Sequence, residues 1–310
     1  MIAGLLAALP SLDALACSTC GCTLNTDLGN QGVEGGKGWR LDLRYDLVDQ
    51  TQLRQWGTAV SLSPPQPFEL EQRTRNTYTD LGVDYGFSRA WGVNLQLPFV
   101  GRFHTTYDTG DTSLSISDYS HALGNVRLMG RYTGFSPDMS NGFLFGLKLP
   151  TGATDRRFDS GPDQGLLLDP TLQPGTGTTD AMLGGYHFGE FGAGLGWFAQ
   201  AMYQRALDSH DGYAPGDSFN LNAGLRFYWG DFLTPQLQVN YQLRARDKGA
   251  QADPADTGGH VLYLSPGITF AFDSGWHGFL FLQLPVHQYV NGLQLSPRRI
   301  ISTGVSYSFR

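Results

Sequence analysis

The stretch that decides the fold is KGWRLDLRYDLVDQ, residues 37–50. Its odd-numbered positions are apolar or aromatic from Trp39 to Leu47, and the even-numbered positions between them carry the charges Arg40, Asp42, Arg44 and Asp46. Successive side chains of a β-strand point to opposite faces of the sheet. The stretch therefore predicts a strand with one apolar face and one wet face, on which charges of alternating sign pair with one another.

The same alternation recurs along the rest of the chain. Seven further stretches show it cleanly, near residues 77–87, 91–99, 125–132, 143–149, 219–229, 236–244 and 301–309. Four more stretches alternate less regularly, near residues 177–187, 193–207, 258–272 and 276–288. Together with residues 37–50 they make twelve predicted strands, an even number, as in bacterial single-chain barrels.

The connections between these strands are alternately long and short. Long connections lie near residues 50–71, 105–118, 152–177, 207–218, 246–258 and 288–298. Short connections lie near residues 87–91, 134–141, 188–192, 230–234 and 272–276. A membrane barrel has short periplasmic turns and longer outer loops, whereas a soluble β-sandwich gives no reason for such sorting.

The composition agrees with strands that face lipid. Charged residues make up 16% of the chain and aromatic residues 13%, whereas a soluble domain usually carries about 25% charged residues. No run of 18 apolar residues is present, so no transmembrane helix is predicted. A sheet in lipid cannot leave an open edge, because each unpaired backbone group costs several kcal/mol. The predicted fold is therefore all-β: a closed, transmembrane, antiparallel up-and-down β-barrel of about 12 strands, with a soluble barrel or sandwich as the alternative.

The first 16 residues predict a secretory signal peptide, and the barrel is then expected in the bacterial outer membrane. The apolar run from Ile2 ends in Ala14-Leu15-Ala16, a small-residue cleavage site directly before Cys17. Two interpretations remain open: simple cleavage after Ala16, or a lipoprotein signal with Cys17 acylated. Cleavage is favoured because Ala14 stands where a lipoprotein signal has leucine.

The three cysteines of the chain, Cys17, Cys20 and Cys22, lie in one C-x-x-C-x-C run. Three thiolates at this spacing predict a site for one soft metal ion, copper or zinc. A disulfide with one free thiol and a lipid on Cys17 remain alternatives. The seven histidines are scattered, and no pair of them shows ligand spacing in the sequence. Residues 17–36 are expected to form either a plug in the barrel mouth or a periplasmic tail that meets a metal or redox partner.

Two short motifs resemble a known family. Gly146-Leu147-Lys148-Leu149-Pro150-Thr151-Gly152 closes a predicted strand, and Leu95-Gln96-Leu97-Pro98-Phe99 lies in an earlier one. They look like the family labelled "MetA-pathway of phenol degradation", whose members are commonly described as transporters, over residues 37–310. The resemblance implies a bacterial outer-membrane channel, linked in some relatives to aromatic compounds. The ending Val305–Phe309, which Arg310 follows, is similar to the C-terminal signature of outer-membrane proteins.

The predicted function is an outer-membrane channel for small solutes rather than an enzyme, since neither G-x-S-x-G nor H-E-x-x-H occurs. A net charge of −7 argues against a nucleic-acid partner and leaves outer-membrane lipid and a small-molecule solute. Inward charges are expected to line the lumen and favour anions mildly: Arg40, Asp42, Arg44, Arg127, Arg131, Lys148, Arg226 and Arg244. The alternatives are a scaffold for a metal or redox centre on the cysteines and an outer-membrane hydrolase.

Overall fold

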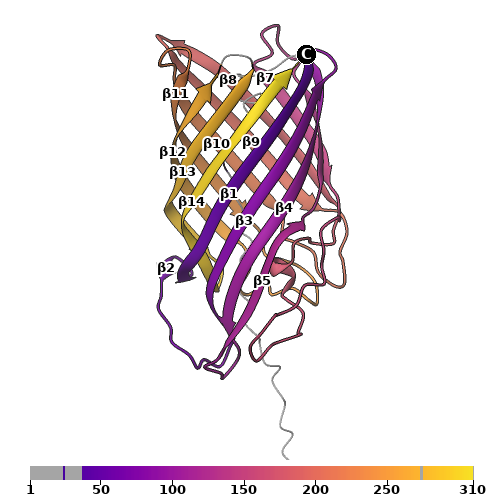
Figure 1. The fold of residues 1–310 in the computed structure, drawn as a ribbon, viewed down its shortest axis with the longest axis vertical. Helices are drawn as coiled ribbons and strands as arrows, with labels where there is room; N and C mark the ends of the chain where they lie inside the picture. Colours follow the sequence, from indigo (N-terminus) through magenta and orange to yellow (C-terminus); the bar gives the residue numbers. More distant parts are fainter. Residues whose placement is uncertain (1–23, 25–36, 273–274, 310) are drawn as a thin grey trace, which may run out of the picture.

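The computed structural model describes residues 24, 37–272 and 275–309 of the 310-residue chain. In Figure 1 these residues form a barrel of tilted strands, with the C-terminus and the short turns at one end and the long loops at the other. The elements are β1 (Gly38–Gln55), β2 (Thr58–Ala59), β3 (Leu70–Gly86), β4 (Trp91–Tyr107), β5 (Leu114–Leu123), β6 (Arg127–Tyr132), β7 (Asn141–Lys148), the 3-10 turn η1 (Pro170–Leu172), β8 (Asp180–Gly192), β9 (Leu195–Ala206), β10 (Ser218–Phe227), β11 (Leu233–Arg244), β12 (Gly259–Ala271), β13 (Trp276–Val290) and β14 (Leu293–Phe309). No helix in the described part of the chain is long and apolar enough to cross a bilayer.

The barrel is closed and antiparallel, and it has twelve strand positions. Closure is made by β1 and β14, whose pairing begins with Trp39 opposite Phe309. The short β2 extends the outer end of β1, and β5 and β6 share one position because both pair with the same side of β4. The fold class and the strand number predicted from the sequence are therefore confirmed.

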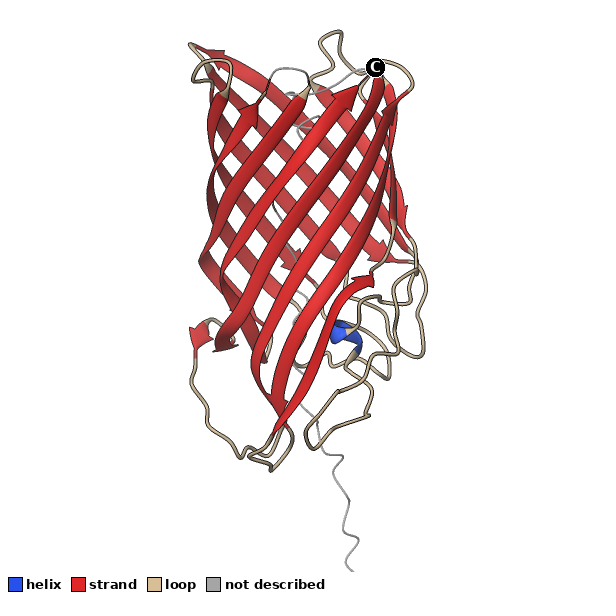
Figure 2. Ribbon diagram, in the orientation of Figure 1, coloured by secondary structure: helices blue, strands red, loops and turns tan. Residues whose placement is uncertain are grey.

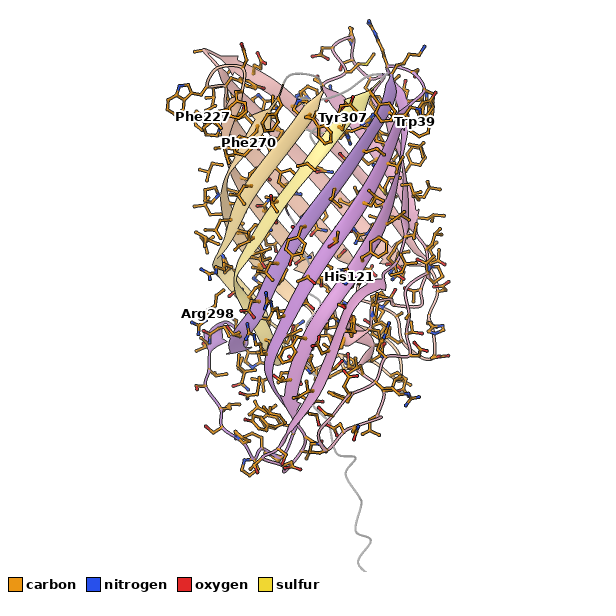
Figure 3. All side chains as sticks on the ribbon, in the orientation of Figure 1. Trp39, His121, Phe227, Phe270, Arg298 and Tyr307 are labelled. Atoms are coloured by element: carbon orange, nitrogen blue, oxygen red, sulfur yellow. The ribbon has the colours of Figure 1, made fainter. Side chains whose placement is uncertain are left out.

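The two faces of the strands differ as the alternation predicts. Along β1 the side chains of Leu41 and Leu43 are exposed on the outside, whereas Arg40 and Asp46 are buried inside. Aromatic rings mark the short-turn end of the apolar band: Trp39 and Tyr85 have ring centroids 4.4 Å apart. Figure 3 shows Trp39, Phe227, Phe270 and Tyr307 at this rim and Arg298 and His121 nearer the long loops. Such a band between two interfaces is typical of a barrel that spans the outer membrane.

Three of the five prolines within the strands coincide with irregularities in the pairing. Pro98 of β4 lies where its neighbour breaks into β5 and β6. The amide of Gly124 donates to the Pro98 carbonyl at 2.8 Å, so the missing Pro98 N–H lies on the side of the break. Pro285 pairs at the bulge of β12 and β13, and Pro297 at the bulge of β1 and β14. Proline in a strand is usually confined to such positions.

The strict alternation of long and short connections is wrong at one place. The connection predicted near residues 288–298 is a tight turn of Asn291 and Gly292, because β13 and β14 continue further outward than the sequence pattern indicates. Gly292 has a φ of +58°, a conformation that glycine adopts without strain. The outer ends of β1, β3 and β14 instead enclose a small core of Leu53, Leu70, Leu293 and Leu295.

The longest outer loop, residues 149–179, folds inward over the barrel mouth. Its Leu168 and Leu172 are buried against Val100, Tyr119 and Ala122 of the barrel wall. Figure 2 shows η1 (blue), which this loop carries, among the long loops and beside β5. The loop therefore caps one side of the lumen.

Candidate functional site in the barrel lumen

The lumen holds a cavity of about 470 Å³. Inward residues of β1, β3, β4 and β6–β11 line the cavity, and residues 170–176 of the inward loop cover its outer side. The wall opposite is filled by large apolar side chains: Phe281 and Tyr263 are fully buried. The lumen is thus a polar cavity beside an apolar filling, rather than an open cylinder.

All eight residues predicted to line the lumen lie on the inner face, and five of them line the cavity itself. Those five are Arg44, Arg127, Arg131, Lys148 and Arg244. Arg40 and Asp42 lie toward the short-turn end, where the Arg40 Nε is 3.1 Å from the Asp42 carboxylate. Arg226 is packed in the wall. Their roles in selecting solutes stay predictions.

Most of the inward cations are neutralised by carboxylates that the sequence-based list omitted. Lys148 Nζ lies 2.7 Å from Asp180 Oδ2, and Arg44 Nε lies 2.8 Å from Asp46 Oδ2. Arg244 Nη2 lies 2.8 Å from Asp247 Oδ1 and Arg131 Nη2 lies 3.5 Å from Asp84 Oδ1. Pairing removes much of the cost of burying these charges.

The cavity wall as a whole carries more positive than negative side chains. Six cations line it, against four acids: Arg44, Arg102, Arg127, Arg131, Lys148 and Arg244, against Asp46, Asp80, Asp84 and Asp180. A sixth cation, Arg102, was missed because Val100 and Arg102 flank a bulge that interrupts the alternation. The excess of positive over negative side chains in the wall is therefore smaller than the list of predicted lumen residues implies.

Three charged residues of the wall have no oppositely charged atom within 4.0 Å in the described part of the chain: Arg102, Arg127 and Asp80. Arg102 is instead hydrogen-bonded to Asn76 and to the Thr171 carbonyl, whereas Arg127 and Asp80 face the cavity from β6 and β3. The Nε of Arg127 and the side-chain oxygens of Asn94 and Asn220 are buried without a hydrogen-bond partner in this part of the chain. These groups are the ones that remain for water or solute to bind.

Arg226 occupies a different environment. Its side chain is 1% exposed, and its guanidinium lies 5.9 Å from the Phe198 ring centre and 5.6 Å from that of Tyr228. A desolvated guanidinium over an aromatic face gains cation–π attraction. Arg226 therefore packs the wall rather than facing solute.

Polar contacts hold η1 against the barrel wall. Arg102 Nη1 donates to the Thr171 carbonyl at 3.1 Å, and the Tyr119 hydroxyl donates to the Leu172 carbonyl at 2.8 Å. The Asp169 carboxylate caps η1 by accepting from the Thr171 amide at 2.7 Å. Asp169 lies outside the membrane-spanning strands, and burial raises its pKa to about 6.

A second carboxyl group with a raised pKa lies just before β3, also beyond the membrane band. Burial raises the pKa of Glu69 to about 7, against the opposing effect of a hydrogen bond with Thr106. Asp169, Asp163 and Asp108 add repulsion that raises this pKa further. The outer end of the lumen thus contains carboxyl groups that ionise near neutral pH.

One described residue of the predicted N-terminal segment also lies in the lumen. Leu24 packs against Phe279 and Phe281, and its carbonyl accepts a hydrogen bond from Arg44 Nη1 at 3.3 Å. Leu24 lines the cavity and narrows it. The predicted signal peptide 1–16 and the cysteines Cys17, Cys20 and Cys22 lie outside the described residues.

The fold is that of solved outer-membrane proteins. The COG4313 outer-membrane channel from Pseudomonas putida F1 matches with a TM-score of 0.62 at 13% identity, over 88% of this chain and 96% of that one. The CymD monoaromatic hydrocarbon channel matches with a TM-score of 0.48 at 12% identity, over 95% and 94%. The KdgM porin matches with a TM-score of 0.42 at 11% identity, over 87% and 99%.

The likeness to the COG4313 channel establishes a barrel fold of the outer-membrane kind and says nothing about the solute. No protein-family model matches the sequence, and no curated protein matches it. The resemblance to the phenol-degradation family therefore stays a prediction.

Proposed function

We propose that the protein is an outer-membrane channel through which small polar solutes diffuse. The observation that carries this proposal is the combination of an apolar outer band with a polar cavity of about 470 Å³ in the lumen. A barrel that served only as an anchor would have no need to bury so many charged side chains, since each buried charge must be paired at a cost in desolvation.

The path is narrow in this conformation. The inward loop with η1 covers one side of the outer mouth of the barrel. Leu24, Phe279 and Phe281 together fill part of the lumen. Twelve strands leave less room than the 16–18 strands of wide porins. We therefore propose a small conductance, with passage controlled by the residues that remain free to bind solute.

The charge of the cavity wall supports a mild preference for anions. Its six cations exceed its four acids. Two of the cations, Arg102 and Arg127, have no close acidic partner among the described residues, and of these Arg102 is bound to Asn76 and to the inward loop, whereas the Nε of Arg127 has no partner. We expect permeating anions to contact Arg127. Asp80 lies on β3, the other strand that pairs with β4, and we expect its negative charge to oppose the preference for anions.

Ion selectivity of the purified protein in planar bilayers under a salt gradient tests the proposal. The wild type is expected to conduct with mild anion preference, Arg127→Gln to lose that preference and Asp80→Asn to increase it. Arg298→Gln is the matched control, because Arg298 is exposed and lies on the outside of the barrel in Figure 3. A folded barrel that carries no current would refute the channel. Conduction with the same reversal potential in all variants would refute the role of Arg127.

A lateral route for apolar solutes is a second candidate, favoured by the break in the barrel wall. One edge of β5 pairs with β4, and no other barrel strand pairs with its second edge among the described residues. An isolated β-bridge between Ile116 and Ser160 joins that second edge to the inward loop. The cavity reaches the break at Gly124 and Asn125. A disulfide in an Ile116→Cys/Ser160→Cys variant should hold the inward loop against β5 and close the break in the wall. Loss of apolar-solute uptake with unchanged ion conductance would support the route, and unchanged uptake would contradict it.

The cysteine run supports a further proposal, a metal site in the N-terminal segment. Its support is the C-x-x-C-x-C spacing of three potential thiolate ligands. We expect about one copper or zinc ion per mature chain and none in a Cys17→Ser/Cys20→Ser/Cys22→Ser variant, measured by elemental analysis after anaerobic reconstitution. Equal metal content in the two proteins would contradict the site.

A further inference from the structure

Two histidines that are far apart in the sequence meet on the outer wall of the barrel. The Nε2 atoms of His260 on β12 and His287 on β13 are 3.2 Å apart. Their ring centres are 5.2 Å apart, with planes inclined by 20°. In the ladder His260 is opposite Tyr289 and His287 is opposite Leu262, so the two imidazoles are diagonal neighbours that reach toward each other.

The pair lies on the outside of the barrel at the end near the long loops. Val261 and Tyr263, the neighbours of His260 on the other face, belong to a buried cluster inside the barrel. His260 is the second residue of β12 and His287 is near the end of β13, so both are at the outer rim of the apolar band. The pair is therefore separate from the lumen.

The surroundings hold the rings in place. The Tyr289 ring is nearly parallel to that of His260, with ring centres 5.2 Å apart and an angle of 11°. Tyr289 itself contacts Trp56 of the outer turn, with ring centres 6.1 Å apart. The bulge between Leu262 and Tyr263 shifts the register of the two strands at this point, and bulges commonly re-aim a side chain.

The separation of the two nitrogens fits a shared metal ion. Zinc–nitrogen bonds are about 2.0–2.1 Å long, and at a tetrahedral angle two such nitrogens lie about 3.3 Å apart. The observed 3.2 Å differs little from this value. Imidazole suits zinc, copper and nickel. We propose that His260 and His287 form a two-histidine site for a divalent transition-metal ion on the outer surface of the barrel.

The site supplies two protein ligands. No group of three or more His, Cys, Asp or Glu side chains in the described part of the chain is placed to hold a metal, so water completes the coordination. A site of this kind is accessible and exchanges its ion readily. Binding requires both rings to be neutral, so protons compete with the metal ion for the two imidazoles.

Calorimetric titration with Zn²⁺ and Ni²⁺ tests the proposal. The titrated protein is the full chain folded in detergent, with the three cysteines replaced by serine so that they contribute no ligand. We expect one ion per chain, with affinity reduced at least tenfold in His260→Ala and in His287→Ala. His121→Asn is the matched control, because His121 is exposed with a φ of +55° that asparagine tolerates.

Electron paramagnetic resonance of added Cu²⁺ supplies a readout that stability changes do not affect. Two equatorial nitrogen ligands in the parent and one or none in each alanine variant would support the site. A plain hydrogen bond, in which one imidazole donates to the other, predicts no stoichiometric metal binding. Absence of binding to the folded parent, or binding that survives both alanine substitutions, would overturn the proposal.

Discussion

At the scale of single residues, charged side chains inside the barrel fall into two kinds that the sequence does not distinguish. Arg127 faces the cavity, whereas Arg226 is packed between the rings of Phe198 and Tyr228. Each arginine alternates with apolar residues along its strand, so the alternation predicts the inner face for both. What separates them is the surroundings of the guanidinium: the ring of Phe198 from the neighbouring strand β9 and the ring of Tyr228 lie against Arg226.

Arg226 can be tested as a packing residue. Its Nε and Nη1 are buried without a hydrogen-bond partner in the described part of the chain, and apolar replacement of a buried charge is often neutral. We expect Arg226→Met to change the free energy of unfolding by less than about 1 kcal/mol and Arg226→Ala to lower it by about 2 kcal/mol through the cavity left behind. Urea unfolding in lipid vesicles measures both, and a severe loss in Arg226→Met would show that the charge itself is needed.

Other residues of the candidate site depend on registers that no local pattern reveals. Asp180 is the first residue of β8 and Asp247 lies in an outer loop, so neither belongs to a clean alternating stretch, yet each pairs with a predicted cation. His260 and His287 come together through the pairing of β12 with β13. The sequence therefore predicts which residues point inward, but not which of them meet.

At the scale of elements, the strands were predictable and their ends were not. Alternation identified a strand at each of the twelve positions because the lipid and the lumen impose opposite demands on neighbouring residues, but it missed β5, which begins within the long connection predicted near residues 105–118. Beyond the membrane band this demand ends, and the outer parts of β13 and β14 continue to the turn at Gly292 with no such pattern. The inward course of the loop that carries η1 is likewise set by contacts with Arg102 and Tyr119 rather than by a local signal.

The carboxyl groups beside η1 predict that this element responds to pH. The pKa values of Glu69 and Asp169 are raised to about 7 and about 6, mainly by burial. A raised carboxyl pKa means that the packed form is most stable at low pH and loses stability as the pH rises from the ordinary value, about 4.5 for Glu69, through the raised one. We expect channel conductance to increase between pH 5 and pH 8 as the outer mouth loosens.

A double variant separates this effect from general titration of the lumen. Glu69→Gln/Asp169→Asn removes both charges. The side-chain oxygen of the asparagine can still cap η1 by accepting the hydrogen bond from the Thr171 amide. We expect its conductance in planar bilayers to be nearly constant over the same pH range. Conductance that rises with pH equally in the variant and the wild type would contradict the assignment to these two groups.

At the scale of the whole molecule, the barrel is specified by a requirement that acts on all strands together. In lipid the unpaired edges of a sheet are too costly to survive, so β1 must find β14 even though the two lie at opposite ends of the described chain. Sequence patterning predicts this closure, since every strand shows an apolar face. It does not predict how the lumen is filled, because Leu24 and the inward loop come from outside the alternating stretches.

The same requirement makes the position of the apolar band measurable. Leu43 lies midway along the outward stripe of β1 between Trp39 and Leu47 and is 47% exposed. An arginine costs about 2–4 kcal/mol at the middle of the bilayer and about 0–1 kcal/mol near its interfaces. We therefore expect Leu43→Arg to lower the free energy of unfolding in lipid vesicles by the larger amount and Leu47→Arg, closer to the exposed Asp49–Arg73 ion pair, by the smaller one. Equal costs at the two depths would mean that this stripe does not face a bilayer, because water solvates an arginine equally well at both positions.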